Sequence, residues 1–159
     1  KISQNWCNLA WLILREIYKI WMSYKFLDHA TDAIIEINAK DLKEAFSVAA
    51  DAVINLTLDQ DKVEENESKK FVAKGKDLYY LLFSWLEEIP FILITEGFAI
   101  KRIEFNIEKN GVYKINAKAF GEILDLKKHN FKVEIKAPTF YDMVIKNEDQ
   151  VYMKFLLDL

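Results

Sequence analysis

The chain has 159 residues, of which 52% are hydrophobic, so we expect one domain with its own core rather than a disordered segment. Its net charge of −3, without long runs of one sign, argues against a protein that grips nucleic acid phosphates directly, because that requires a basic face. The single cysteine, Cys7, excludes an internal disulfide and favours a cytoplasmic protein, and one cysteine with two histidines cannot form a structural zinc site.

Residues 1–21 form an apolar N-terminal extension that has two interpretations. Apolar residues recur there at three- and four-residue steps, which is consistent with a helix. Arg15, Glu16 and Lys19 interrupt the apolar run, so we expect neither a membrane span nor a signal peptide. Either Met22 is the native initiator and residues 1–21 come from an over-extended start, or these residues form a genuine extra helix that packs on the domain or in a dimer contact.

Two strands are predicted around a polar corner. Segments 24–28 and 33–39 read as extended, and the second alternates apolar and polar residues like a half-buried strand. The corner itself contains Asp28, His29 and Asp32. It therefore gathers three groups that are able to bind a metal ion.

Two amphipathic helices follow, with a strand at 68–73 between them. Asp41 is placed to cap the first helix, Glu44 completes a capping-box pattern, and the apolar stripe continues to Leu56. Asp77 is placed to cap the second helix. With the strands, these helices predict an α+β domain.

The second helix carries Trp85, which we expect in the core or in a groove rather than in catalysis. Glu87 and Glu88 are expected to be solvated, at a place where a partner could dock. Pro90 should kink or end the helix, because it lacks an N–H group, and Gly97 is a suitable C-terminal stop.

A long hairpin is predicted around the Asn-Gly dipeptide that ends at Gly111. A two-residue turn would place Ile107 opposite Lys114, whereas a three-residue loop at 109–111 places Ile107 opposite Tyr113. The second register keeps the apolar residues on one face. We therefore predict the three-residue loop, with Gly111 left-handed and in a bulge.

A basic loop follows, and it includes Lys127, Lys128 and His129. It is the one local concentration of positive charge in the chain. The loop either contacts a phosphate, of RNA or of a nucleotide, or is simply solvated.

The last two segments predict a terminal hairpin. Residues 131–146 read as extended, with Tyr141 on the apolar face and with an edge or bulge at Pro138, which cannot donate to a ladder. The final strand alternates so that Asp158 lies opposite its buried face. If this strand pairs near the first, Asp158 meets Asp32. Both carboxylates, with the main-chain or terminal oxygens of Leu159, would then suit Ca²⁺ or Mg²⁺.

Four stretches of the chain together resemble the archease family. They occur in the same order as in that family and span Tyr24 to Leu159. The stretches are LDHATD with the following AIIEINAKDLKEAFSVAADAVINL, KDLYYLLFSWLEE, GEILDLKKHNFKVEIKAPTFYDM and the terminal LLDL. The resemblance implies a single domain at 22–159, with mixed or antiparallel sheets and two main helices.

Archease proteins are accessory factors of the RtcB-type RNA ligase that joins tRNA halves after intron removal. The resemblance implies an activator, rather than a stand-alone enzyme, that promotes ligase guanylylation and multiple turnover. GTP and tRNA would be reached through the ligase. It further implies a divalent-metal site at Asp32, Asp158 and Leu159, and a functional role for Lys136.

The chain departs from the family pattern at three points, which are Ala30-Thr31, Pro138 and Tyr141. The first swap keeps Asp32 in register, and the others place a proton-transfer role near residue 141 in doubt. Two alternative functions stay open. One is a metal-dependent hydrolase built on Asp32, Asp158 and His29, although no nucleophile–base pair or Gly-rich phosphate loop is visible. The other is a general chaperone or protein-interaction domain.

Overall fold

The structure is a computed structural model that describes residues 23–28 and 31–159. The interpretations of residues 1–21 and Met22, and the position of His29, lie outside the described residues. The elements in chain order are β1 (Ser23–Asp28), β2 (Asp32–Ala39), α2 (Leu42–Thr57), the 3₁₀ turn η1 (Gln60–Lys62), β3 (Glu67–Gly75), α3 (Leu78–Pro90), the π-helical turn η2 (Phe91–Thr95), β4 (Phe98–Asn110), β5 (Val112–Ile123), β6 (Ala137–Asn147) and β7 (Val151–Asp158).

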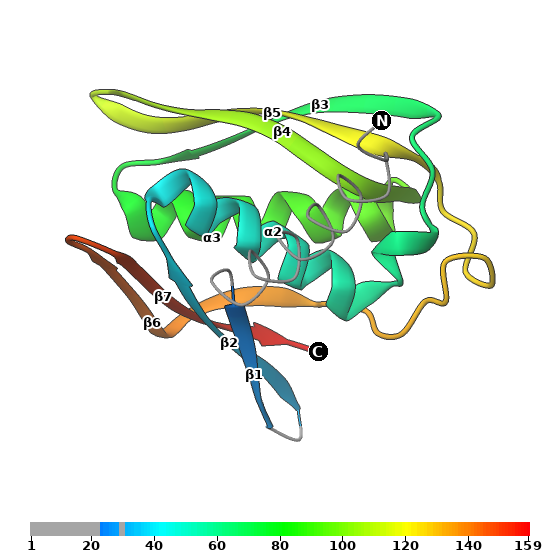
Figure 1. Cartoon of the computed structure of the whole chain (residues 1–159), viewed down its shortest axis with the longest axis horizontal. Helices are drawn as coiled ribbons and strands as arrows, with labels where there is room; N and C mark the ends of the chain where they lie inside the picture. Colours follow the sequence, from blue (N-terminus) through cyan, green and yellow to red (C-terminus); the bar gives the residue numbers. More distant parts are fainter. Residues whose placement is uncertain (1–22, 29–30) are drawn as a thin grey trace, which may run out of the picture.

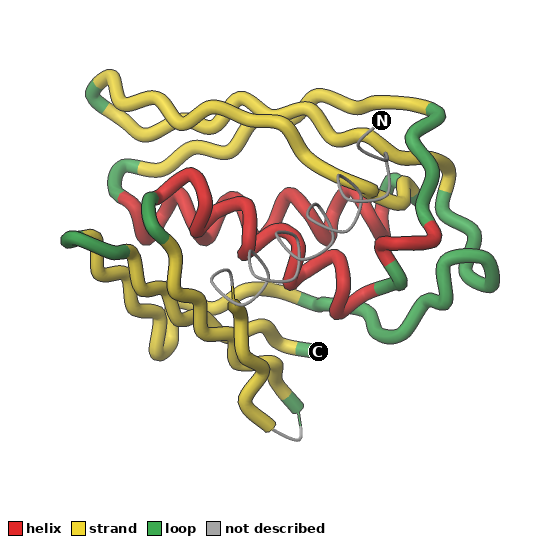
Figure 2. Tube along the Cα trace, viewed as in Figure 1, coloured by secondary structure: helices red, strands yellow, loops and turns green. Residues whose placement is uncertain are grey.

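Two antiparallel sheets enclose the two helices (Figures 1 and 2). One sheet has the strand order β1-β2-β7-β6 and the other the order β3-β5-β4. The helices α2 and α3 form the middle layer, and α3 contacts both β3 and β6. This arrangement confirms the predicted α+β class with antiparallel sheets and two main helices.

The helix starts agree with the predicted caps. The Asp41 carboxylate accepts the Glu44 N–H at 2.8 Å, and the Asp77 carboxylate accepts the Tyr80 N–H at 3.0 Å. The Glu44 carboxylate does not complete the expected box at Asp41. It accepts instead the N–H of Lys40, one residue earlier, at 2.7 Å.

Trp85 lies at the centre of the core, as predicted, and has no exposed surface. Its ring stacks on Phe71 with centroids 5.4 Å apart and lies 4.9 Å from Phe105, so it reaches the three-stranded sheet. Its indole N–H donates to the Phe46 carbonyl of α2 at 3.0 Å, which satisfies the one polar atom of the side chain.

The end of α3 explains how the chain accommodates Pro90. The α-helix stops at Pro90, as expected, but the chain continues through η2, where Glu96 N–H donates to the Phe91 carbonyl at 3.0 Å. Gly97, with φ of +60°, then ends the helical path.

Leu78–Thr95 is long and apolar enough to cross a membrane by length and composition alone. Its buried residues, which include Leu81, Leu82 and Trp85, belong to the core, and α3 contacts strands of both sheets.

The β4–β5 hairpin has the predicted facing but not the predicted register. Ile107 lies opposite Ile115 rather than Tyr113, because the reversal is centred on Gly111 instead of Asn110. The shift is two residues, so the apolar side chains still share one face. Gly111 has the expected positive φ of +74°, whereas the irregularity in pairing lies between Ile100 and Arg102.

The strand β6 corrects two further predictions. It begins at Ala137, so residues 131–136 are not part of the sheet. It is an edge strand, as Pro138 suggested, and its register with β7 shifts between Thr139 and Val144. Tyr141 lies inside this irregular stretch and is 75% exposed rather than on the apolar face. The left-handed backbone at Asp142 (φ +55°) breaks the alternation on which that prediction relied.

Candidate functional site

The antiparallel pairing of β2 with β7 places Asp32 directly opposite Asp158. The register is set by packing, because alternate residues of β7 face the core and are almost fully buried. These residues are Val151, Met153, Phe155 and Leu157. Asp158 is consequently exposed, while Asp32 is partly buried. The predicted meeting of the two aspartates is confirmed.

The hydrogen bonds of this corner show how close the two aspartates come. Leu159 N–H donates to the Thr31 carbonyl at 3.2 Å, so Thr31 and Leu159 form a hydrogen-bonded pair. The neighbouring pair, Asp32 and Asp158, is then of the non-hydrogen-bonded type, in which side chains lie closest. Like charges directly opposite each other destabilise an antiparallel ladder, and a cation between them would offset that repulsion.

Lys136 joins the same corner from the segment that leads into β6. Its N–H donates to the Asp158 carbonyl at 2.9 Å, and its ammonium donates to the Leu159 carbonyl at 2.6 Å. Its neighbour Ala137 lies opposite Asp158 in the β6–β7 ladder. We refer to Asp32, Lys136, Asp158 and Leu159 as the carboxylate corner.

The sequence model of the Archease protein family (MTH1598/TM1083) matches residues 24–159. The chain belongs to the archease family. Protein archease of Pyrobaculum islandicum is 38% identical over 141 residues, which cover 87% of this chain and 96% of that protein. Protein archease of Pyrococcus abyssi is 39% identical over 129 residues, covering 80% and 89% respectively. The solution structure of Methanobacterium thermoautotrophicum protein 1598 is 28% identical with a TM-score of 0.69, covering 86% of this chain and 98% of that chain.

These comparisons confirm the resemblance that the four sequence motifs indicated. The family match includes both β2 and β7, so the carboxylate corner lies within the archease domain. Residues 1–23 precede the match.

The donors of the carboxylate corner fit a hard cation. Among residues 23–28 and 31–159, no group of three or more His, Cys, Asp or Glu side chains is placed to hold a metal. The corner instead offers two carboxylates and the Leu159 carbonyl, all oxygen ligands of the kind that Ca²⁺ and Mg²⁺ prefer, with water completing the shell. The Lys136 ammonium already occupies the Leu159 carbonyl, so this lysine would compete with a cation for that oxygen.

Asp28 lies at the end of β1, opposite Ala33, which is the residue that follows Asp32 in β2. His129 is fully buried elsewhere: its Nδ1 accepts the Asp125 N–H and its Nε2 lies 3.0 Å from a Glu122 carboxylate oxygen. His129, named from the sequence as a further candidate near the site, thus forms its side-chain contacts with the basic loop and Glu122. The contacts of His129 with Asp125 and Glu122 depend on how the loop folds, and no local spacing in the sequence predicts that.

The basic loop is held by carboxylates rather than left free. The Lys128 ammonium bonds both oxygens of Glu122, at 2.8 and 2.9 Å, and also Glu64 at 3.3 Å. Asp125 accepts the N–H groups of Lys127 and Lys128, each at 2.9 Å. These contacts compensate much of the positive charge that suggested a phosphate contact.

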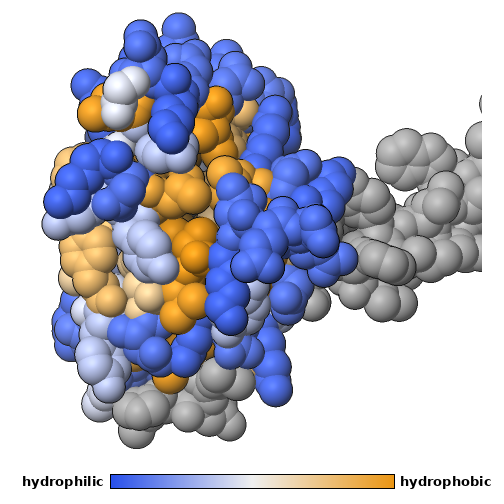
Figure 3. Space-filling model, turned by 90° about the vertical axis from the view of Figure 1, so that its left-hand side faces the viewer, coloured by the Kyte–Doolittle hydropathy of each residue, from blue (hydrophilic) through white to orange (hydrophobic). Residues whose placement is uncertain are grey.

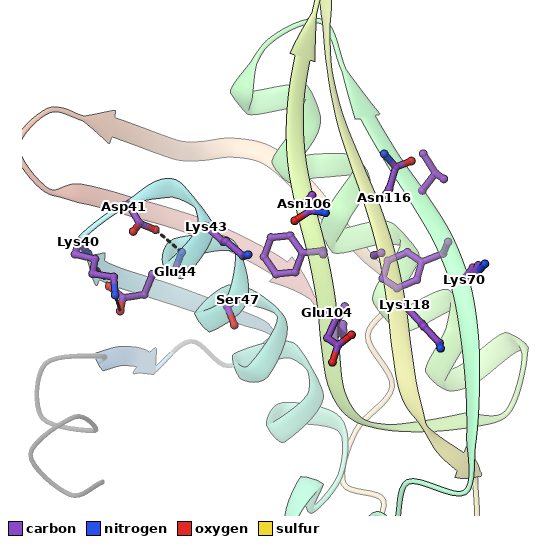
Figure 4. Close-up of a pocket in the computed structure, with 15 residues that line it drawn as sticks. Lys40, Asp41, Lys43, Glu44, Ser47, Lys70, Glu104, Asn106, Asn116 and Lys118 are labelled. Atoms are coloured by element: carbon purple, nitrogen blue, oxygen red, sulfur yellow. Dashed lines mark hydrogen bonds and ion pairs between the residues drawn. The ribbon is translucent and has the colours of Figure 1, made fainter. Parts of the chain in front are cut away.

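A pocket of about 850 Å³ separates the first turns of α2 from the three-stranded sheet (Figure 4). Lys43 points from α2 toward the sheet, whereas Lys70, Asn116 and Lys118 lie on the side of the strands away from α2. The polar groups therefore do not converge on one ligand, and we assign no role to the pocket.

On the face seen in Figure 3, a band of apolar residues runs down the middle, with hydrophilic residues above it and to its right.

Proposed function

We propose that this archease is an accessory factor of an RtcB-type RNA ligase in the cytoplasm, and that it promotes guanylylation and repeated turnover of the ligase in tRNA splicing. In this proposal the chain is an activator and not itself the ligase. A divalent cation, Ca²⁺ or Mg²⁺, binds at the carboxylate corner. The observation that carries the proposal is the direct pairing of Asp32 with Asp158, beside Lys136 and the Leu159 carbonyl.

The chemistry of the corner suits a reaction between phosphates. A bound divalent cation neutralises charge that develops on a triphosphate during nucleotidyl transfer. Asp32 and Asp158 would hold that cation where the two central strands of the four-stranded sheet, β2 and β7, begin and end, and the exposed Asp158 leaves it open to a partner. Lys136 is exposed, and its ammonium can turn from the Leu159 carbonyl toward a phosphate oxygen.

The test is a ligation time course with the cognate ligase, GTP, a divalent metal and excess split tRNA. We expect the ligase alone to stall near a single turnover and to continue when the chain is added. Asp158→Asn and Asp32→Asn should abolish this stimulation, because they remove the cation site. Asp149→Asn makes the same chemical change in the exposed β6–β7 turn and should leave stimulation intact.

Full stimulation by Asp158→Asn would overturn the role of the corner. Failure of the unaltered chain to change either guanylylation or turnover would overturn the accessory function itself. Nucleotide hydrolysis by the isolated chain, lost in Asp158→Asn, would instead support the metal-dependent hydrolase.

A further inference from the structure

A groove of about 400 Å³ lies beside the carboxylate corner, between the end of α3 with η2 and the segment 134–138. It shares Lys136 with the corner, so the two sites are continuous. Seven of its twelve lining residues are apolar, and Phe91 is 49% exposed at its rim. The apolar lining consists of Leu86, Pro90, Phe91, Ile94, Ile135, Ala137 and Pro138.

The charged rim of this apolar groove is acidic. Glu87, Glu88 and Glu134 line it, and none of them forms an ion pair with a lysine or arginine of the described chain. Lys136 is the only cation in the lining, and its ammonium is directed to the Leu159 carbonyl. The groove therefore combines apolar surface with negative charge that the described chain does not pair.

The position of these carboxylates on α3 is unfavourable for the isolated chain. Glu87 and Glu88 are adjacent carboxylates at the place where α3 passes into η2. Neither the last turn of α3 nor η2 contains a basic residue. Burial raises the pKa of Glu88, and the charges of Glu87 and Glu96 raise it further. A cation supplied from outside the chain would relieve this repulsion.

We propose that the groove is a docking site for a basic side chain, an arginine in preference to a lysine, on the surface of the partner ligase. This inference rests on the proposed function, because it names the ligase as the occupant. The aliphatic stem of the arginine would lie along Phe91 and Pro138 while its guanidinium pairs with the glutamates. An RNA-joining enzyme has the complementary charge, since surfaces that bind RNA phosphates are basic. Docking here would bring the carboxylate corner to the edge of the RNA-binding surface.

The experiment measures the Kd of the full chain for the cognate ligase by titration calorimetry, at low and at high salt. Glu87→Lys and Glu134→Lys should each weaken binding about tenfold and reduce its salt dependence, as expected for loss of an interfacial ion pair. Glu148→Lys reverses the same charge in the exposed β6–β7 turn and is the matched control. Thermal unfolding should show Glu87→Lys at least as stable as the unaltered chain, because the substitution removes a like charge beside Glu88.

The groove and the corner are separated by their readouts. The groove variants should regain full stimulation of turnover at saturating concentration, whereas Asp158→Asn should bind the ligase and fail to stimulate it. An unchanged Kd in both groove variants overturns the docking site and leaves the accessory function standing. Absence of any binding by the unaltered chain overturns both the docking site and the accessory function. If Glu148→Lys weakens binding as much as Glu87→Lys does, only the docking site is overturned, because the effect is then one of net charge. Binding of Ca²⁺ or of a second copy that is lost in Glu87→Lys, with ligase affinity unchanged, also overturns it.

Discussion

Glu122 shows how neighbouring groups hold one ionisable residue in a single state. Its carboxylate accepts from the Lys128 ammonium, from the Glu64 N–H at 2.9 Å and from His129. The Lys128 bond contributes most, and together these bonds lower the pKa of Glu122 from 4.5 to about 2. The ionised carboxylate is therefore much more favourable in the folded chain than in the unfolded one.

Glu122→Gln should change the dependence of stability on pH. Because the folded pKa is lowered, the stability from this carboxylate is present above pH 4.5 and is lost as the pH falls through about 2. We expect the free energy of unfolding, measured in urea at a series of pH values, to decline less steeply in Glu122→Gln across this window. Glu148→Gln, in an exposed turn, is the control, and parallel curves for all three proteins would contradict the prediction.

Trp85→Phe tests the buried indole. The substitution removes the indole hydrogen bond to the Phe46 carbonyl and opens space between Phe71 and Phe105. Both effects destabilise, and we expect a loss of about 3 kcal/mol in the free energy of unfolding. Denaturant titration measures this loss, provided that the slope is unchanged. Phe91→Leu, at the exposed rim of the groove beside α3, is the control. A loss below about 1 kcal/mol in Trp85→Phe would contradict the prediction.

Single residues were predictable from the sequence where their partners lie nearby in the chain. The caps Asp41 and Asp77 act on N–H groups three residues ahead, and Trp85 belongs to the apolar stripe of its own helix. His129 was not predictable, because Glu122 meets it only after the intervening loop reverses.

At the scale of elements, the three-stranded sheet depends on a close approach between β4 and β5. A Cβ atom added at Gly121 would lie 1.8 Å from the Ala99 carbonyl oxygen, and backbone cannot move aside as the end of a side chain can. The same region holds the register irregularity between Ile100 and Arg102. The absence of a side chain at Gly121 therefore lets the two strands pair at this bend.

Gly121→Ala should consequently force the two strands apart. We expect it to cost about 3 kcal/mol of unfolding free energy, as for other overpacked sites. Gly97→Ala is a useful comparison, because nothing lies within 4 Å of its added Cβ and only the positive φ is strained, at about 1 kcal/mol. Thermal and denaturant unfolding measure both variants, and equal losses would show that contact with Ala99 is not the cause.

The elements themselves were predicted better than their registers and breaks. Alternation of apolar residues predicted which face of the β4–β5 hairpin is buried, but a shift of two residues leaves that alternation unchanged. The pattern therefore did not predict that the reversal centres on Gly111. The exposure of Tyr141 depends on the backbone at Asp142, which adopts a conformation that no apolar pattern encodes.

At the scale of the whole molecule, the carboxylate corner exists only because β2 and β7, which are far apart in the sequence, pair in one sheet. Pairing of Asp32 with Asp158 followed from the sequence once β7 was placed beside β2. The acidic groove did not, because its two sides come from α3 and from the segment before β6. No sequence motif relates those segments to each other.

A cation at the corner should stabilise the entire fold, since it binds the folded chain alone. At a free Ca²⁺ concentration a hundredfold above Kd, the expected gain is about 2.7 kcal/mol. Asp158→Asn should remove this gain, and in excess chelator it should be no less stable than the unaltered chain, because repulsion across the ladder is reduced. Thermal unfolding with Ca²⁺, Mg²⁺ or chelator measures this, and an equal gain in Asp158→Asn and the control Asp149→Asn would contradict it.

The place of β7 also affects how the protein folds during its synthesis on the ribosome. This strand is the last in sequence, yet it lies between β2 and β6 in its sheet. In a nascent chain that lacks residues 151–158, β6 has no strand to pair with and β2 keeps only β1, so Ile35 and Ile37 lack their β7 partners Phe155 and Met153. Asp32 then has no opposite carboxylate. Translation itself thus delays assembly of the corner until the codons of residues 151–159 have been read, so a product truncated before β7 would lack the corner even where its helices have folded.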